Sequence, residues 1–314
     1  MLTLEAEVVQ LQEEGLLSPE AAAPLIAEER HEIVTVYTEV RALAWLGVMF
    51  IAGGAGVLVS RNLDRIGPIA VAAAIGLAAA GCYGYTVWRR TRGRSGALDE
   101  SILLLGALLL STDIGYLEYQ FHFLGSAWPR HFVLLALIHG VTAYVFDSAA
   151  LLSLSIAALA SWLGIERNVD TFFTNSLGTA SRAFGCAALV TVWRFANRRA
   201  GFERVFDHFI ANLALWGGLI LTFNRETRDL GALVVIVMAA LAMVYGFRKR
   251  EEAFLIYSLI YAVLAIDVAV VTRFVTVVTR FNEPILALFY LVVSTIAAIV
   301  ALFQIHLRFR KAAA

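Results

Sequence analysis

Residues 285–307 read ILALFYLVVSTIAAIVALFQIHL, a stretch of 23 residues without Asp, Glu, Lys or Arg. A helix needs about 20 apolar residues to cross the hydrocarbon core of a bilayer, which is roughly 30 Å thick. The stretch is therefore long enough to span a membrane once. It predicts a transmembrane helix and makes the lipid bilayer the solvent of this part of the chain.

The rest of the chain repeats this pattern. Uncharged runs of similar length lie at 42–60, 66–88, 148–165 and 230–247. Three more runs reach full length once each admits one ionisable residue: 101–118 with Asp113, 171–193 with Arg182, and 253–272 with Asp267. The shorter runs 132–146 and 209–224 bring the expected number of spans to about ten. Only Asp147 separates 132–146 from 148–165, so a re-entrant or tilted helix is the alternative there.

The composition supports a membrane protein. The 314 residues are 60% hydrophobic and 16% charged, whereas soluble domains average about 45–50% and 25%. Because 25 basic residues balance 25 acidic ones, the charge indicates no nucleic-acid partner. The two cysteines, Cys82 and Cys186, lie in apolar runs and form neither a disulfide framework nor a metal motif. We therefore predict an all-α, polytopic integral membrane helix bundle.

The two ends of the chain are expected outside the bilayer. Residues 1–40 predict a short cytoplasmic helical hairpin, since Ser18-Pro19-Glu20 is a typical helix start. The acidic first 20 residues do not resemble a signal peptide. The transmembrane bundle is expected over 41–307, followed by a cytoplasmic tail over 308–314. With ten spans and both termini inside, 16 of the 25 basic residues fall on the inner side, as the positive-inside rule favours.

Asp113, Arg182 and Asp267 stand inside three of these spans, where a charge costs on the order of 3 kcal/mol or more. Counted from the charged inner edge of each span, they lie roughly 20, 18 and 22 Å into the membrane. All three would then occupy the outer half of the hydrocarbon core at a similar depth. If Arg198 instead of Arg194 marks the inner edge, Arg182 moves out to the interface.

Two acids and one base at one depth cannot all be ionised and paired, because one negative charge is left over. In a low-dielectric site the least costly solutions are a protonated aspartate or a bound cation. This is the physical argument for proton or cation handling. The alternative is a static polar network, because membrane bundles also use polar side chains to hold helices together.

Glu118, Gln120 and His122 are further candidates for a substrate- or ion-binding site. Gln120 is expected on the same helical face as Asp113, and Glu118 shares another face with His122. Glu118 and His122 are four residues apart, as a metal-binding pair on a helix can be. A lone pair of this kind is more often an interfacial hydrogen bond, so we predict no metal site and no cofactor.

Three elements within the first 140 residues carry a resemblance to a known family. They are Gly15-Leu16-Leu17-Ser18 with Ala21-Ala22-Ala23, Leu46-Gly47 through Arg61-Asn62-Leu63-Asp64, and Gly106-Ala107-Leu108-Leu109 leading to Gln120-Phe121-His122. Together they resemble a family of uncharacterised bacterial multi-pass membrane proteins defined by a domain of unknown function (number 2157). That family tends to have Asn-Trp after the first span and Gln-x-Tyr-His in the third element, so two aromatic positions depart from it. The resemblance implies a protein of the bacterial inner membrane and no particular activity, cofactor or substrate.

These observations favour a small-solute or ion transporter-like protein, with Asp113 and Asp267 as proton- or cation-linked carboxylates and Arg182 as their counter-charge. The alternative is a structural or partner-binding membrane protein without transport or catalysis. An enzyme is the least favoured class, because the chain has no Gly-x-Ser-x-Gly and no His-Glu-x-x-His. The expected partners are the lipid bilayer and a small solute, proton or cation.

Overall fold

The computed structural model describes residues 67–93, 97–163, 176–278 and 284–313, together with separate positions between Gln12 and Val57. All regular structure in these residues is helical. Almost all of the predicted lead-in over 1–40, and part of the predicted span 42–60, lie outside the described residues. The chain divides into two compact units, Met1–Tyr116 and Leu117–Ala314, and the boundary falls within helix α5, Ala97–Phe121.

In the first unit, α4 covers Pro68–Thr91 and begins and ends at clear local signals. Its proline stands in the first turn, where the missing N–H costs no hydrogen bond. Arg89 and Arg90 occupy the last turn, where positive charge interacts favourably with the helix dipole. Gly93 follows with a φ of 66°, a left-handed conformation that glycine adopts without strain.

The α4 helix packs against the part of α5 that belongs to the same unit. Val71, Ile75 and Ala79 of α4 form a buried cluster with Leu109 of α5. At the end where α4 stops and α5 starts, Arg89 Nε lies 3.1 Å from Asp99 Oδ1. An apolar interface with an ion pair at its end is the arrangement expected of two neighbouring membrane helices.

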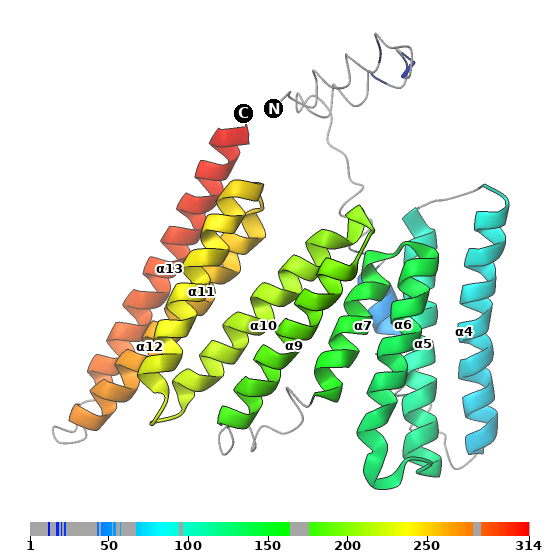
Figure 1. The fold of residues 1–314 in the computed structure, drawn as a ribbon, viewed down its shortest axis with the longest axis horizontal. Coiled ribbons are helices and arrows are strands. Elements are labelled where there is room, and N and C mark those ends of the chain that lie inside the picture. Colours follow the sequence, from blue (N-terminus) through cyan, green and yellow to red (C-terminus); the bar gives the residue numbers. More distant parts are fainter. Residues whose placement is uncertain are drawn as a thin grey trace. The chain divides into compact units, whose positions relative to one another are not determined.

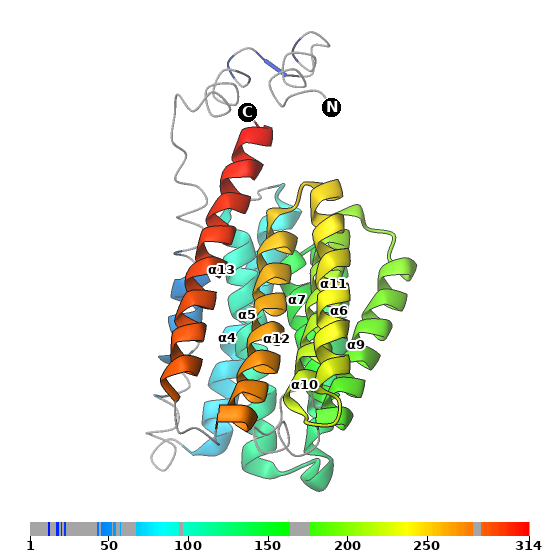
Figure 2. The same ribbon diagram turned by 90° about the vertical axis from the view of Figure 1, so that its left-hand side faces the viewer.

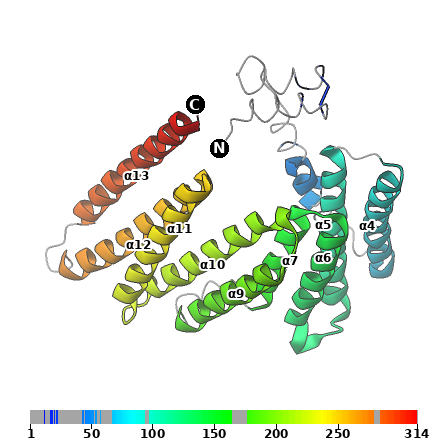
Figure 3. The ribbon, with the colours of Figure 1, turned by 45° about the horizontal axis from the view of Figure 1, so that its top comes forward.

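The second unit holds the remaining described helices (Figure 1). In chain order these are η1 Gly125–Arg130, α6 His131–Phe146, α7 Ala149–Trp162, α9 Ser176–Ala196, η2 Ala200–Phe202, α10 Glu203–Phe223, α11 Arg228–Lys249, α12 Glu252–Val278 and α13 Pro284–Ala313. Helix α6 packs on α7, α9 packs on α10, and α10 packs on both α11 and α12. Figure 2 shows α12 next to α11 and α13, and Figure 3 shows α9 beside α10, as their contacts also indicate.

The segment predicted with an alternative, 132–165, forms two helices packed on each other. Asp147 separates them because it adopts a left-handed conformation, with φ 46°. Ser148 then caps α7, its hydroxyl accepting a hydrogen bond from the Leu151 N–H at 3.4 Å. The Ser155 hydroxyl of α7 donates to the carbonyl of Ala136 in α6 at 2.6 Å. The hairpin is therefore fastened both at its turn and between its helices.

Small residues let α10 and α11 approach closely. A Cβ atom on Gly231 of α11 would lie 2.5 Å from the backbone nitrogen of Thr222 in α10. A Cβ on Gly218 of α10 would lie 2.9 Å from a methyl group of Val235. Close approach of this kind supplies the van der Waals packing that holds membrane helices together in the absence of a hydrophobic drive between them.

Six described segments are long and apolar enough to cross a membrane. They are Pro68–Thr91, Leu98–Phe121, Ala200–Phe223, Arg228–Lys249, Glu252–Arg273 and Ala287–Leu307. Helices α6 and α7 are apolar but shorter, and α9 is not among the six. The all-α class is thus observed in the described residues, with six of the roughly ten predicted spans reaching full length there.

Candidate functional site

Asp113 lies in α5 and faces α4 within the first unit. Its Oδ1 atom is buried and has no hydrogen-bond partner among the described residues. Its Oδ2 atom would lie only 3.1 Å from a Cβ atom at Gly76 of α4, so the absence of a side chain there leaves room for the carboxylate. The hydroxyl group of Tyr116, one turn further along α5, is also buried without a described partner. The region thus holds one carboxyl oxygen and one phenol oxygen that are buried without a hydrogen-bond partner among the described residues.

Asp267 has a different environment in α12. The hydroxyl of Ser294 in α13 donates to its Oδ1 atom at 2.7 Å, and Tyr290 of the same helix also interacts with this carboxylate. Both partners lie one turn apart on α13, as residues four positions apart in a helix do. Asp267 therefore joins α12 to α13, and its charge is partly satisfied by hydrogen bonding.

Arg182 lies in α9 with an exposed side chain. No ion pair joins it to Asp267, and α9 and α12 are not packing neighbours in the described part of the chain. The proposed role of Arg182 as a counter-charge stays a prediction. Its exposure places the guanidinium on the outside of the packed helices of its own unit.

The three weaker candidates cluster at the end of α5. Glu118 is buried, and its carboxylate accepts hydrogen bonds from the Leu124 N–H at 3.1 and 3.3 Å. His122 takes a φ of 51°, and its N–H donates to the Glu118 carbonyl at 2.9 Å. Gln120 and His122 are exposed. The contacts of Glu118 close the helix end, and ligand binding by these three residues stays a prediction.

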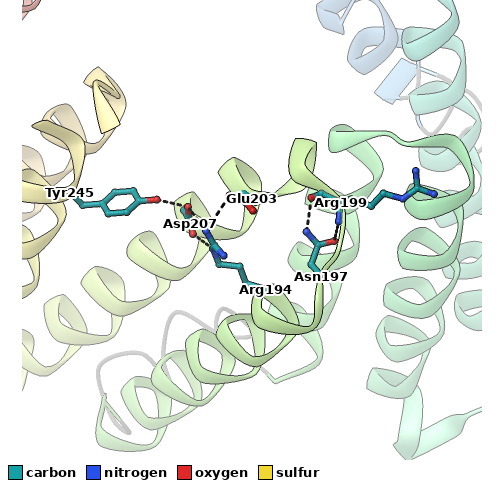
Figure 4. Close-up of polar contacts among 6 residues, drawn as sticks. All are labelled: Arg194, Asn197, Arg199, Glu203, Asp207 and Tyr245. Atoms are coloured by element: carbon teal, nitrogen blue, oxygen red, sulfur yellow. Dashed lines mark hydrogen bonds and ion pairs between the residues drawn. The ribbon is translucent and has the colours of Figure 1, made fainter. Parts of the chain in front are cut away.

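A polar cluster that we did not predict lies at the junction of α9, α10 and α11. We call Arg194, Glu203, Asp207 and Tyr245 the Asp207 cluster (Figure 4). Arg194 of α9 forms an ion pair with Asp207 of α10 through Nε and Oδ1, with a second hydrogen bond from Nη2 to Oδ2 at 3.4 Å. The Tyr245 hydroxyl of α11 donates to Oδ2 at 2.5 Å. Arg194 Nη2 also lies 3.5 Å from Glu203 Oε2.

The electrostatics of the Asp207 cluster follow from these contacts. The hydrogen bond with Asp207 raises the pKa of Arg194 above its ordinary value, with burial acting in the opposite direction and the charges of Asp207 and Glu203 adding to the rise. The side chains of Arg194 and Asp207 are 24% and 16% exposed, so solvent screens the pair only in part. One carboxylate therefore joins three helices through charge-assisted hydrogen bonds.

A chain of hydrogen bonds continues from the end of α9 to α6. The Trp193 indole N–H donates to the Tyr144 hydroxyl at 3.0 Å, and that hydroxyl donates to Asn197 Oδ1 at 3.0 Å. The Asn197 amide donates to the Arg199 carbonyl at 2.7 Å, as Figure 4 shows. These bonds fix the turn between α9 and α10, and with it the position of Arg194.

Only weak sequence signals pointed to this cluster. Arg194 counted in the sequence as the basic residue that marks the edge of a span, and Asp207 preceded the uncharged run 209–224. An Asp one turn inside a helix and a Tyr one turn before a basic helix end are each ordinary at an interface. Their convergence depends on contacts between helices far apart in sequence, which no local pattern encodes.

Comparison with known proteins tests the resemblance seen in the sequence. Residues 9–152 match the family described as "Predicted membrane protein (DUF2157)", which confirms that resemblance. No curated protein and no solved structure matches the chain. The matched region takes in α4, α5, α6 and the start of α7. The chain is a multi-pass membrane protein, and its residues 9–152 match the DUF2157 family of predicted membrane proteins.

Proposed function

We propose that this protein conducts protons or small cations, or a solute coupled to them, across a membrane, with Asp113 as the carboxylate that changes its charge. The observation that carries the proposal is the buried Oδ1 atom of Asp113, which has no partner among the described residues. An ionised carboxylate without a partner in a low-dielectric region is costly, so the state that holds a proton or a cation is favoured. Release and uptake of that ion is the elementary step of coupled transport.

The surroundings of Asp113 support this role. Gly76 leaves space at Oδ2, and one turn away on the same helix Tyr116 adds a hydroxyl that has no partner among the described residues. Ion sites in transporters lie near the bilayer midplane. Asp113 is eight residues from the end of α5 at Phe121, roughly 12 Å along the helix axis. This depth suits a carboxyl that exchanges an ion between the two sides.

The proposal includes the topology expected from the sequence: about ten spans in a bacterial inner membrane, with both termini in the cytoplasm. Basic side chains stand in the last turn of α4 and of α11, which hold Arg89, Arg90, Arg248 and Lys249. They also stand at the α9–α10 turn, with Arg198 and Arg199. These ends are the ones assigned to the cytoplasm, and short cytoplasmic loops are enriched in Lys and Arg.

The test is ion flux in liposomes containing the purified protein and a trapped pH-sensitive dye. With an imposed membrane potential, the wild type should acidify or alkalinise the lumen faster than empty liposomes, and Na⁺ and K⁺ gradients are compared in parallel. Asp113→Asn should reduce the flux at least tenfold. Asp267→Asn is the matched control, since the same change is made at a carboxylate that keeps a Ser294 contact.

A second candidate is a structural or partner-binding membrane protein. It is favoured by the hydrogen bond between Asp267 and Ser294, which uses a membrane aspartate to join two helices. In that case no gradient would drive flux above the level of empty liposomes. Flux that is equal in the wild type and Asp113→Asn would also reject the proposed role of Asp113.

A further inference from the structure

Helix α4 offers no polar side chain beside Asp113. From Pro68 to Gly81 its side chains are all apolar, without an ionisable group, a hydroxyl or an amide. The first titratable residue of α4 is Cys82, which packs against the apolar cluster between α4 and α5. The run 42–60, which the sequence predicts as the first span, contains no ionisable residue either, and Ser60 carries its hydroxyl group. An ion that binds at Asp113 must therefore be held by few side-chain atoms.

The hydroxyl groups that precede Asp113 in α5 are directed elsewhere. Ser111 and Thr112 stand two positions and one position before Asp113, and residues at such spacings do not face each other on a helix. Their hydroxyls donate to carbonyls one turn back in α5, at 2.9 and 2.8 Å. Tyr116 is three positions after Asp113 and so shares its face. The oxygens on this face that lack a described partner are Oδ1 of Asp113 and the hydroxyl of Tyr116.

These few oxygens suit a proton better than a metal cation. Ca²⁺ takes about six to eight oxygen ligands, and K⁺ channels surround their ion with rings of backbone carbonyls. The backbone carbonyls of α4 and α5 are engaged in hydrogen bonds within each helix, so they do not replace the hydration shell of a cation. A proton needs one carboxyl oxygen. It also leaves the side chain neutral, which is the form that a low-dielectric surrounding favours.

Tyr116 is placed to be a hydrogen-bond partner of the carboxyl in both of its states. Long side chains in helices lean back over the preceding turn, which for Tyr116 is the turn that holds Asp113. Its ring packs against the buried apolar cluster of α4 and α5, which keeps the phenol at the interface of these two helices. A phenol hydroxyl donates to an ionised carboxylate and also to the carbonyl oxygen of a neutral carboxylic acid. The same contact therefore serves before and after a proton arrives.

We propose that the ion taken up by Asp113 is a proton, and that Tyr116 is the positioning residue that keeps the carboxyl oriented during the exchange. This inference rests on the ion conduction proposed above and names its ion. Uptake forms an O–H bond at one carboxyl oxygen and removes the negative charge, while the Tyr116 hydroxyl donates to the other oxygen directly or through one water molecule. Loss of the proton to the opposite side of the membrane restores the carboxylate, so atoms and charge balance without another reactant.

The first experiment follows the protonation of Asp113 without measuring transport. Infrared spectra of the full-length protein in liposomes are recorded over a pH titration. The C=O band of the protonated Asp113 carboxyl is the band that is lost in Asp113→Asn and kept in Asp267→Asn. Na⁺ and K⁺ should leave the midpoint pH of this band unchanged, with choline chloride as the control for ionic strength. A metal cation that competes for the same carboxylate would lower the midpoint by about one pH unit for each tenfold rise in its concentration above its Kd.

Tyr116→Phe tests the positioning role, with Tyr119→Phe as the matched control. Tyr119 stands on the same helix one turn further along and is 72% exposed. Tyr116→Phe should move the Asp113 band to higher frequency, because a carboxyl C=O that loses a hydrogen bond stretches at higher energy. It should also slow proton flux about tenfold, the rate equivalent of one hydrogen bond to a charged group. Tyr119→Phe should change neither the band nor the flux.

The outcomes separate this inference from the proposed function. Flux driven by a pH gradient, together with a band that neither Na⁺ nor K⁺ displaces, supports both. Flux that requires Na⁺ or K⁺ and is lost in Asp113→Asn would keep the transport function and reject the proton. A band that is unmoved in Tyr116→Phe would reject the role of Tyr116. Flux no greater than that of empty liposomes would reject the proposed function and this inference with it.

Discussion

Asp113 and Asp207 are the same residue type in apolar helices, yet their carboxyl oxygens have different hydrogen-bond partners. Oδ1 of Asp113 has no described partner, and Gly76 only makes space beside Oδ2. Asp207 accepts hydrogen bonds at both oxygens, from Arg194 and from Tyr245. One carboxylate has an oxygen without a partner among the described residues, and the other is held by two neighbouring helices.

This difference shows that the hydrogen-bond partners of an aspartate in a membrane helix indicate whether it stabilises the fold or serves a function. A carboxylate with charge-assisted hydrogen bonds stabilises the fold in its ionised form and gains nothing from a proton. A buried carboxylate without partners destabilises the fold whenever it is ionised, so it persists where the protein uses it. Burial alone does not distinguish the two cases; the partner does.

The largest expected effect contrasts the glycine beside Asp113 with a glycine where α10 and α11 approach closely. In Gly231→Ala the new methyl group would meet the backbone of α10, which cannot move aside, so we expect a loss of about 3 kcal/mol. In Gly76→Ala the methyl group meets the end of the Asp113 side chain, which can rotate. Thermal melting in detergent should show a much larger fall in Tm for Gly231→Ala. Gly185→Ala, with open space around it, is the control and should be close to neutral.

Breaking the ion pair of the Asp207 cluster comes next. Arg194→Gln leaves a partly buried carboxylate without its cation and should cost about 2 kcal/mol. Adding Asp207→Asn removes the unpaired charge, so the double variant should melt at a higher temperature than Arg194→Gln alone. A double variant that melts at the sum of the two single losses would show that the charges do not interact.

Asp113→Asn should change stability in the opposite direction. Replacing a carboxyl whose Oδ1 has no described partner with a neutral amide removes the cost of ionisation, so the free energy of unfolding should rise by about 1 kcal/mol or stay unchanged. Asp207→Asn should lower the free energy of unfolding. The melting curves of the two variants measure this difference between Asp113 and Asp207 directly. A fall in Tm for Asp113→Asn as large as that for Asp207→Asn would mean that Asp113 has a stabilising partner.

The smallest effect is expected for the bond between α12 and α13. Ser294→Ala removes the hydroxyl that donates to Asp267 and should cost about 0.6 kcal/mol, the average for such bonds between membrane helices. Thr295→Ala is the control, because that hydroxyl donates to the Leu291 carbonyl of its own helix. Equal melting temperatures of the two variants would mean that the bond between Ser294 and Asp267 does not stabilise the packing of α13.

The helices could largely be predicted because hydrophobic length is a local property. The runs 66–88, 230–247 and 285–307 correspond to α4, α11 and α13, each extended by a few residues into charged ends. The run 209–224 was too short because α10 begins at Glu203, among charged residues that pair with neighbouring helices. A helix that begins among charged residues is stable only where neighbouring helices pair with those charges. Hydropathy therefore cannot predict where α10 begins.

The candidate site could be predicted only in part, because ionisable residues are visible in a sequence and their partners are not. Asp113 was singled out by its apolar neighbours, and its unpaired oxygen agrees with the cost that drew attention to it. Asp267 met the same criterion but is hydrogen-bonded to Ser294. The pairing of Arg194 with Asp207 depends on how α9 turns into α10 through Asn197 and Arg199.

The hairpin of α6 and α7 has a consequence for the lipid around it. The 16 residues of α6 and the 22 residues of α11 make helices roughly 24 and 33 Å long. A short apolar helix in a protein that also contains long ones produces hydrophobic mismatch, which the bilayer relieves by thinning at the short helix. The bilayer would then be thinner next to α6 than elsewhere. The protein would partition into thin bilayers in preference to thick ones.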